Sequence, residues 1–145
     1  MDTVFLDANI LFSAARRLDS RLRRLWDLPN ARLVTSVYAG NEARRHLVGR
    51  DQRQALADLL ARMRIVVTRG RWAAAPAEAA ALPTKDRPIL RGALEAGATH
   101  LLTGDRRHFG AFYGQRIEGV LVLPPAAYLD PALAADEAPE ADVPS

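Results

Sequence analysis

Five short, mainly apolar segments recur along the chain, and helical patterns separate them. The first, residues 3–7 (TVFLD), is apolar at consecutive positions and ends in an acid, which is typical of a buried parallel strand. The other four are residues 32–36, 64–68, 100–103 and 119–123. Strands that alternate with helices are joined by right-handed crossovers. The pattern therefore predicts an α/β fold in three layers, with a mostly parallel five-stranded sheet and helices on both faces.

Helix signals occupy the intervals between these segments. Ser20 and Asp51 are polar residues placed to cap helices that carry apolar residues on one face. Residues 72–82 are rich in alanine and predict a helix around Pro76. Residues 84–88 (TKDRP) read as another helix start, and Gly97 ends that helix.

The length of 145 residues fits one domain, and we expect that domain to span residues 1–130. Residues 131–145 are rich in alanine, proline and acids, a composition that predicts a disordered tail. These residues carry four acids and no base, so residues 1–130 hold 20 basic residues against 13 acidic ones. A body with this positive balance favours anionic partners, nucleic acid among them.

Several classes of protein are excluded by composition. The chain has no cysteine, so it has neither a disulfide framework nor a cysteine zinc site. No apolar run approaches the roughly 20 residues of a membrane span. The first strand begins too early for a signal peptide to precede it. We therefore expect a cytoplasmic protein with no membrane association.

Four acids are placed to meet at one edge of the predicted sheet. Asp7 ends the first strand, Asp105 follows the fourth, and Asp86 opens the helix that leads into the fourth. Glu42 lies about a turn and a half into the helix after the second strand. Ligands of such sheets bind at the carboxyl ends of the strands. Carboxylates are the ligands that Mg²⁺ and Mn²⁺ prefer, and these ions activate water and stabilise charge on a phosphate.

Each acid also has an ordinary structural interpretation. The three aspartates sit where an Asp can cap a helix, and Glu42 can be a solvated helix residue. Capping, however, predicts no link among them, whereas a cation explains why four repelling charges are tolerated together. Asn9 and Thr103 are second candidates, because an amide and a hydroxyl near the same edge can position a water or a carboxylate.

Three stretches resemble the PIN-domain nucleases, and among them the VapC-like toxins. They are VFLDANIL (residues 4–11), TSVYAGNEARRHL (residues 35–47) and LPTKDRPILRGALEAGATHLLTGDRRHF (residues 82–109). The last is the most specific, since an acid opens an Ile/Leu/Ala helix, a Gly-Ala turn follows, and a strand ends in T-x-D. The resemblance spans about residues 2–130.

The resemblance implies strand order 3-2-1-4-5, a Mg²⁺ or Mn²⁺ site and endoribonuclease activity on RNA. In a VapC-like toxin, Asp7, Glu42, Asp86 and Asp105 would be the catalytic acids, and the three aspartates would hold the metal. The resemblance also implies a homodimer and an antitoxin protein that blocks the site.

The chain departs from this pattern just beyond the last acid. Many relatives carry a further Asp or Asn three or four residues on, where this chain has His108 and Phe109. A lone histidine is a poor zinc signal. Arg106 and Arg107 follow Asp105, and Arg87 follows Asp86. We expect these guanidiniums to lie beside the acids and to contact substrate phosphates.

Other α/β families fit less well. A HAD-type phosphatase needs a second acid where Asn9 stands, and a receiver domain needs a phosphorylatable Asp after the third strand, which here ends in Val67-Thr68-Arg69. The chain has no glycine-rich nucleotide motif. The remaining alternative to a nuclease is a catalytically idle PIN module that binds RNA or a partner protein.

Overall fold

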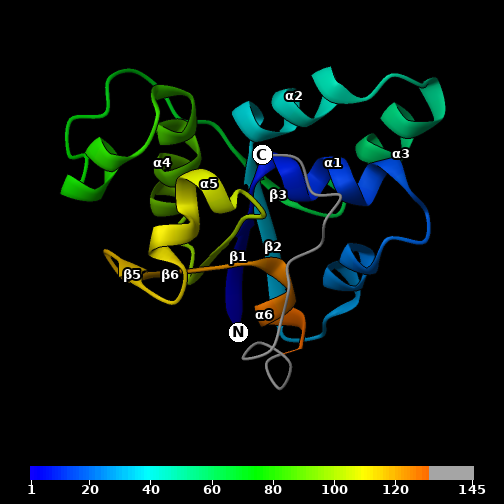
Figure 1. Ribbon diagram of the computed structural model, residues 1–145. Helices are drawn as coiled ribbons and strands as arrows, with labels where there is room; N and C mark the ends of the chain where they lie inside the picture. Colours follow the sequence, from blue (N-terminus) through cyan, green and yellow to red (C-terminus); the bar gives the residue numbers. More distant parts are fainter. Residues whose placement is uncertain (131–145) are drawn as a thin grey trace.

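The computed structural model describes residues 1–130 and shows a sheet flanked by helices (Figure 1). Six strands of this part of the chain form the sheet, in the order β3-β2-β1-β4-β6-β5. Their bounds are β1 Asp2–Leu6, β2 Ala31–Ser36, β3 Arg64–Val66, β4 His100–Leu102, β5 Arg116–Ile117 and β6 Val120–Leu123. The pair β5–β6 is antiparallel, and the other four neighbouring pairs are parallel. The predicted α/β class is confirmed, and β6 takes the place of the predicted fifth strand.

Helices and 3₁₀ turns (η) connect and cover the strands. Their bounds are α1 Ala8–Arg16, η1 Arg21–Asp27, α2 Val37–His46, α3 Arg50–Leu60, η2 Ala77–Ala81, η3 Thr84–Asp86, α4 Arg87–Glu95, α5 Arg106–Phe109, η4 Gly110–Phe112 and α6 Pro125–Leu129. Val4, Phe5 and Leu6 of β1 are all fully buried. Because consecutive strand residues point to opposite faces, both faces of the central strand are covered.

One glycine decides how closely α4 approaches the sheet. A Cβ on Gly92 would lie 2.9 Å from two ring carbons of Phe5. That distance is well inside van der Waals contact, so a side chain here would push α4 or the ring away. The close packing matters to the site, because η3 and its Asp86 lead directly into α4.

Two helix predictions need correction. The helix predicted over residues 72–82 is wrong, since only the 3₁₀ turn Ala77–Ala81 forms there. Pro76 sits in an extended conformation just before it, and a proline also disfavours helix at the preceding residue. The helix predicted to be capped by Asp51 begins at Arg50, so Gly49 is its N-cap and Asp51 lies in its first turn. There the negative charge still favours the helix dipole.

The strand β5 is an addition that the sequence did not predict. It pairs antiparallel with β6 through a two-residue turn in which Glu118 and Gly119 both have positive φ, at 48° and 89°. Positive φ at both turn positions is the geometry that closes a tight hairpin. A strand of two residues has no alternating pattern long enough to read from sequence.

The predicted tail, residues 131–145, lies outside the described residues, so its disorder and the domain boundary stay predictions. Within residues 1–130, none of the helices combines the length and the apolar character needed to cross a bilayer.

Candidate active site

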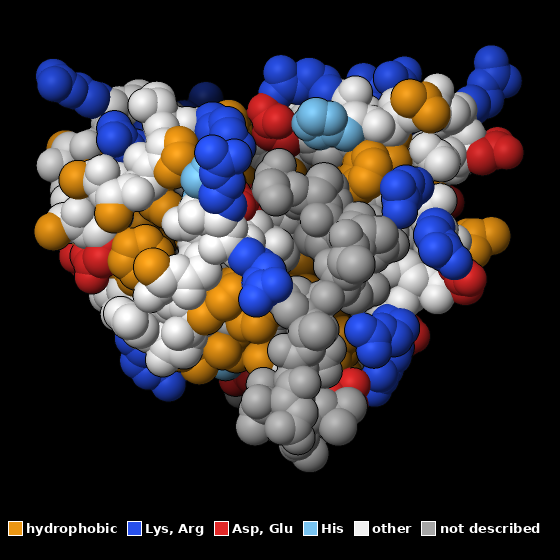
Figure 2. All heavy atoms as spheres, viewed as in Figure 1, with side chains coloured by type: hydrophobic (Ala, Val, Ile, Leu, Met, Phe, Trp, Pro, Cys, Tyr) orange, Lys and Arg blue, Asp and Glu red, His pale blue; other side chains and the backbone are white. Residues whose placement is uncertain are grey.

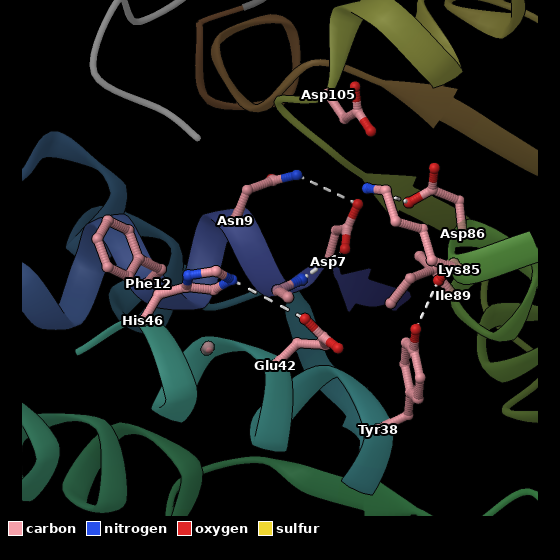
Figure 3. A pocket seen from close by; sticks show the side chains of 12 residues that line it. Asp7, Asn9, Phe12, Tyr38, Glu42, His46, Lys85, Asp86, Ile89 and Asp105 are labelled. Carbon is pink, nitrogen blue, oxygen red and sulfur yellow. Dashed lines mark hydrogen bonds and ion pairs between the residues drawn. The ribbon is translucent and has the colours of Figure 1, made fainter. Parts of the chain in front are cut away.

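Four carboxylates line one cavity of about 110 Å³ at the carboxyl edge of the sheet (Figure 3). Asp7 directly follows β1, and Asp105 lies in the loop after β4. Asp86 ends η3, and Glu42 comes from α2. Figure 3 shows Asp7 at the centre, with the other three acids around it. The structure thus brings together the four acids that the sequence singled out.

Asp7 is buried and hydrogen-bonded on both carboxylate oxygens. Its Oδ1 accepts from the backbone N–H of Ala8 at 2.6 Å, so Asp7 does cap α1. Its Oδ2 accepts from the Thr103 hydroxyl at 2.8 Å. Burial, together with smaller contributions from the charges of Asp86 and Asp105, raises the pKa of Asp7 from 3.8 to about 6 in spite of these hydrogen bonds. The cap explains its position, but a capping residue is not ordinarily buried at such a cost.

Asn9 and Thr103 tie Asp7 to the loop that carries Asp105. The Asn9 amide nitrogen lies 3.3 Å from Asp7 Oδ2, and its oxygen accepts from Gly104 N–H at 2.9 Å. The Thr103 hydroxyl oxygen accepts from Asp105 N–H at 3.1 Å while its proton goes to Asp7. These two buried side chains therefore fix the relative positions of two acids.

Asp86 is buried at the C-terminal end of η3. Burial is the main cause that raises its pKa, and the Asp105 charge adds to it, while Lys85 lowers it. The Lys85 ammonium lies 3.6 Å from Asp86 Oδ1. The other oxygen, Oδ2, is buried and has no hydrogen-bond partner within residues 1–130. A buried acceptor without a donor is expensive and calls for an explanation.

Asp105 is buried and caps the short helix α5. Its Oδ1 accepts from His108 N–H at 3.1 Å, and its Oδ2 lies 2.8 Å from the ring Nδ1 of the same residue. His108 Nδ1 also lies 3.0 Å from Asp86 Oδ2. Donor atoms of these three residues all fall within 4.8 Å of one another. Sequence reasoning assigned no role to His108, and the signal that could have found it was its position three residues past Asp105 in the same capped turn.

Glu42 is the most accessible of the four acids, with 29% of its side chain exposed. Its carboxylate pairs with Arg45, one turn further along α2, and lies 3.9 Å from His46 Nε2. A pairing with a solvent-facing arginine on its own helix is what the solvated interpretation predicts. Glu42 nonetheless lines the cavity opposite the aspartates, so it can reach a group bound there.

Comparisons with known proteins establish the fold. No family model and no curated protein matches this sequence. A chain in the crystal structure of VapBC2 from Rickettsia felis, bound to a DNA fragment from their promoter, superposes with a TM-score of 0.59 at 16% sequence identity. The match covers 84% of this chain and 98% of that one. This chain has a VapC-like PIN-domain fold. At this identity the likeness concerns the fold alone.

The three arginines that the sequence placed beside the acids of this PIN-like fold do not line the cavity. Arg87 points its Nε to the carbonyls of Ala79 and Leu82, both at 3.1 Å, and so holds η2. The expectation that it lies beside the acids is therefore not met. Arg106 and Arg107 are exposed on α5 and remain available to solvent or to a ligand.

A different basic cluster adjoins the acids. Arg44 and Arg45 of α2 and Arg53 of α3 line a cleft of about 470 Å³, here called the α2–α3 cleft. Tyr38 forms part of its wall and also part of the wall of the acidic cavity. Figure 2 shows Lys and Arg side chains along the upper edge of the molecule, over α2. Sequence reasoning missed this cluster because Arg53 reaches it from a different helix.

Proposed function

We propose that this chain is a divalent-metal-dependent endoribonuclease that hydrolyses RNA phosphodiester bonds, and that it is the toxin of a type II toxin–antitoxin pair. The observation that carries the proposal is the convergence of four acids, three of them buried, from four separate elements on one cavity. A structural role for each acid does not require that they meet. The VapC-like PIN-domain fold supports the same interpretation.

The donor set fits Mg²⁺ or Mn²⁺. Both ions favour carboxylate and water oxygens, and Asp86 offers a buried oxygen that no hydrogen-bond donor satisfies within residues 1–130. Asp7, Asp86 and Asp105 would hold the ion, with Glu42 on the far side of the cavity. Such an ion, when bound, supplies an activated water and neutralises charge that develops on the phosphate.

The surrounding side chains do the positioning. Thr103 and Asn9 hold Asp7 against the 103–105 loop, so two acids keep their separation whether or not an ion is bound. Lys85 lies at the cavity and carries a positive charge 3.6 Å from Asp86. It can shift from the carboxylate to a substrate phosphate when an ion takes its place. We propose that these residues hold the acids together against their mutual repulsion.

A polyanionic substrate needs positive charge beside an acidic site. The α2–α3 cleft supplies it, because guanidinium groups bind phosphate oxygens well and the cleft shares Tyr38 with the acidic cavity. Arg44 is the residue most available for this, since its side chain has no hydrogen bond or ion pair to any part of residues 1–130. Phosphate contact by Arg106 and Arg107 stays a prediction.

The matched structure is a VapBC2 complex bound to promoter DNA. By analogy, we propose that an antitoxin protein binds this chain, that the chain forms a homodimer, and that it acts in the cytoplasm.

A cleavage assay tests the activity. Purified protein is incubated with a labelled mixed-sequence RNA and with single-stranded DNA of the same sequence, with and without Mn²⁺. We expect cleavage of RNA that requires the metal and is nearly abolished by Asp105→Asn. The amide keeps the Oδ1 that accepts from His108 N–H, so the cap survives while the charged ligand is lost. Asp19→Asn, at an exposed acid outside the cavity, is the matched control.

The alternative is a catalytically idle PIN module. RNA binding without cleavage, under every metal tried, would favour that alternative. Equal cleavage rates for wild type and Asp105→Asn at sub-saturating metal would instead reject these acids as the active site.

A further inference from the structure

His108 occupies a place that hydrogen bonding alone does not explain. One ring nitrogen, Nδ1, lies 2.8 Å from Asp105 Oδ2 and 3.0 Å from Asp86 Oδ2. Nδ1 carries at most one proton. It is within hydrogen-bond reach of Asp105, and Asp86 Oδ2 remains buried without a hydrogen bond within residues 1–130. With the Nδ1 position directed at Asp105, the Asp86 oxygen that lies almost as close is left without a hydrogen bond of its own in the described part of the chain.

A cation bound by His108 Nδ1, Asp105 Oδ2 and Asp86 Oδ2 would satisfy both carboxylate oxygens. Ligand bonds of about 2.1 Å in an octahedral site put adjacent ligand atoms about 3.0 Å apart. The two nitrogen–oxygen distances here match that spacing, and the donor atoms of Asp86, Asp105 and His108 form one cluster. The α5 cap builds this arrangement, because the bond from His108 N–H to Asp105 Oδ1 brings the ring beside the other carboxylate oxygen.

We propose that His108 is a metal ligand through Nδ1, so that the site selects Mn²⁺ and other transition ions over Mg²⁺. Imidazole nitrogen is a softer ligand than carboxylate oxygen, so replacing an oxygen ligand by it disfavours the hard ion Mg²⁺ more than a transition ion such as Mn²⁺. A neutral imidazole beside two carboxylates also leaves the site less negative than a further acid would. The inference rests on the proposed metal-dependent function, but only in that both need an ion at these aspartates.

The test measures metal binding without RNA. Mn²⁺ and Mg²⁺ affinities are determined by titration calorimetry for wild type, His108→Ala and His108→Asp. Pulsed electron paramagnetic resonance on the Mn²⁺ complex then detects coupling to a ligand nitrogen. The chain has three histidines. His46 lines the same cavity without joining the cluster, so His46→Ala is the matched control.

We expect nitrogen coupling in wild type and in His46→Ala, and none in His108→Ala. Mn²⁺ affinity should fall at least about tenfold in His108→Ala, since even residues that only support a ligand are worth about 10- to 100-fold. His108→Asp should bind both ions, with the preference for Mn²⁺ over Mg²⁺ reduced. Circular dichroism spectra of all variants check that α5 keeps its fold.

Nitrogen coupling that survives in His108→Ala, or that is absent from wild type, would overturn the inference. So would an unchanged Mn²⁺-to-Mg²⁺ ratio in His108→Asp. Each result is separable from the proposed function. A protein that binds Mn²⁺ through His108 but cleaves no RNA keeps the inference and loses the activity. One that cleaves RNA with no nitrogen signal does the reverse.

Discussion

Asp7→Asn should make the protein more stable in the absence of metal, which is an unusual result for a buried residue of an active site. Burial and two neighbouring acids raise the pKa of Asp7 from 3.8 to about 6. Each pKa unit corresponds to about 1.36 kcal/mol, so the ionised carboxylate costs the folded state about 3 kcal/mol at neutral pH. The amide removes that charge.

Part of this gain is lost through hydrogen bonds. The amide introduced at position 7 would keep one oxygen for the Ala8 N–H, but its NH₂ group would face the Thr103 hydroxyl and the Asn9 amide. Losing these contacts costs about 1–2 kcal/mol. The net expectation is a gain of about 1–2 kcal/mol above pH 7, or roughly 3–8 °C in melting temperature for a domain of this size.

The stability advantage of Asp7→Asn over wild type depends on pH. A carboxyl whose folded pKa is raised contributes stability below its unfolded pKa, and that contribution is lost as pH rises through the folded value. The advantage of the variant should therefore be absent below about pH 4, grow between pH 4 and 6, and stay constant above. Urea unfolding with EDTA at several pH values measures this profile. Asp19→Asn serves as the control, because Arg17 lowers the pKa of that exposed carboxyl and neutralising it brings no gain.

Bound metal should reverse the order of stability, so that wild type becomes more stable than Asp7→Asn. An ion at 100 times its dissociation constant stabilises the folded state by about 2.7 kcal/mol. Wild type should gain this and Asp7→Asn much less. The reasoning is refuted if the variant is the less stable protein at pH 7.5 in EDTA, or if Mn²⁺ raises both melting temperatures equally.

Three further outcomes are expected. Arg44→Ala should reduce the slope of log RNA affinity against log salt by about 0.7, which corresponds to a roughly fivefold loss of affinity at 0.1 M salt. Arg32→Ala, at an exposed position of β2, should leave both the slope and the affinity unchanged. Filter binding in EDTA measures both quantities, and equal slopes for the two variants would show that the α2–α3 cleft does not bind substrate. Gly92→Ala should lower the free energy of unfolding by about 1–3 kcal/mol through overpacking against Phe5. Gly110→Ala should cost little, because no atom lies closer than 3.9 Å to the new carbon. Similar urea midpoints for the two variants would contradict the close packing of α4 on the sheet. Ser36→Ala should lower the free energy of unfolding by about 1 kcal/mol, because the Ser36 hydroxyl accepts from Ala39 N–H at 3.1 Å and so caps α2, the helix that carries Glu42. An unchanged urea midpoint would show that this cap is dispensable.

The sequence by itself determined the class of fold and the edge at which the acids meet. Buried parallel strands are uniformly apolar, whereas the helices between them have one polar face. The alternation of strands and helices can therefore be recognised from the sequence. The carboxyl ends of parallel strands share an edge, which places Asp7 and Asp105 together without knowledge of packing. The same argument failed where local chemistry overrode composition. Alanine content predicted a helix over residues 72–82, and the structure there has only the 3₁₀ turn that follows Pro76.

Only the tertiary structure decided what surrounds each acid. The 3.0 Å approach of His108 to Asp86 joins residues 22 positions apart, and the α2–α3 cleft joins arginines of two helices. Arg87 illustrates the converse, since its neighbour Asp86 enters the site while its own guanidinium turns to η2. Adjacent residues on a helical turn point in different directions, and distant residues meet only when elements pack. The raised pKa of Asp7 has the same origin, because desolvation is a property of the packed interior.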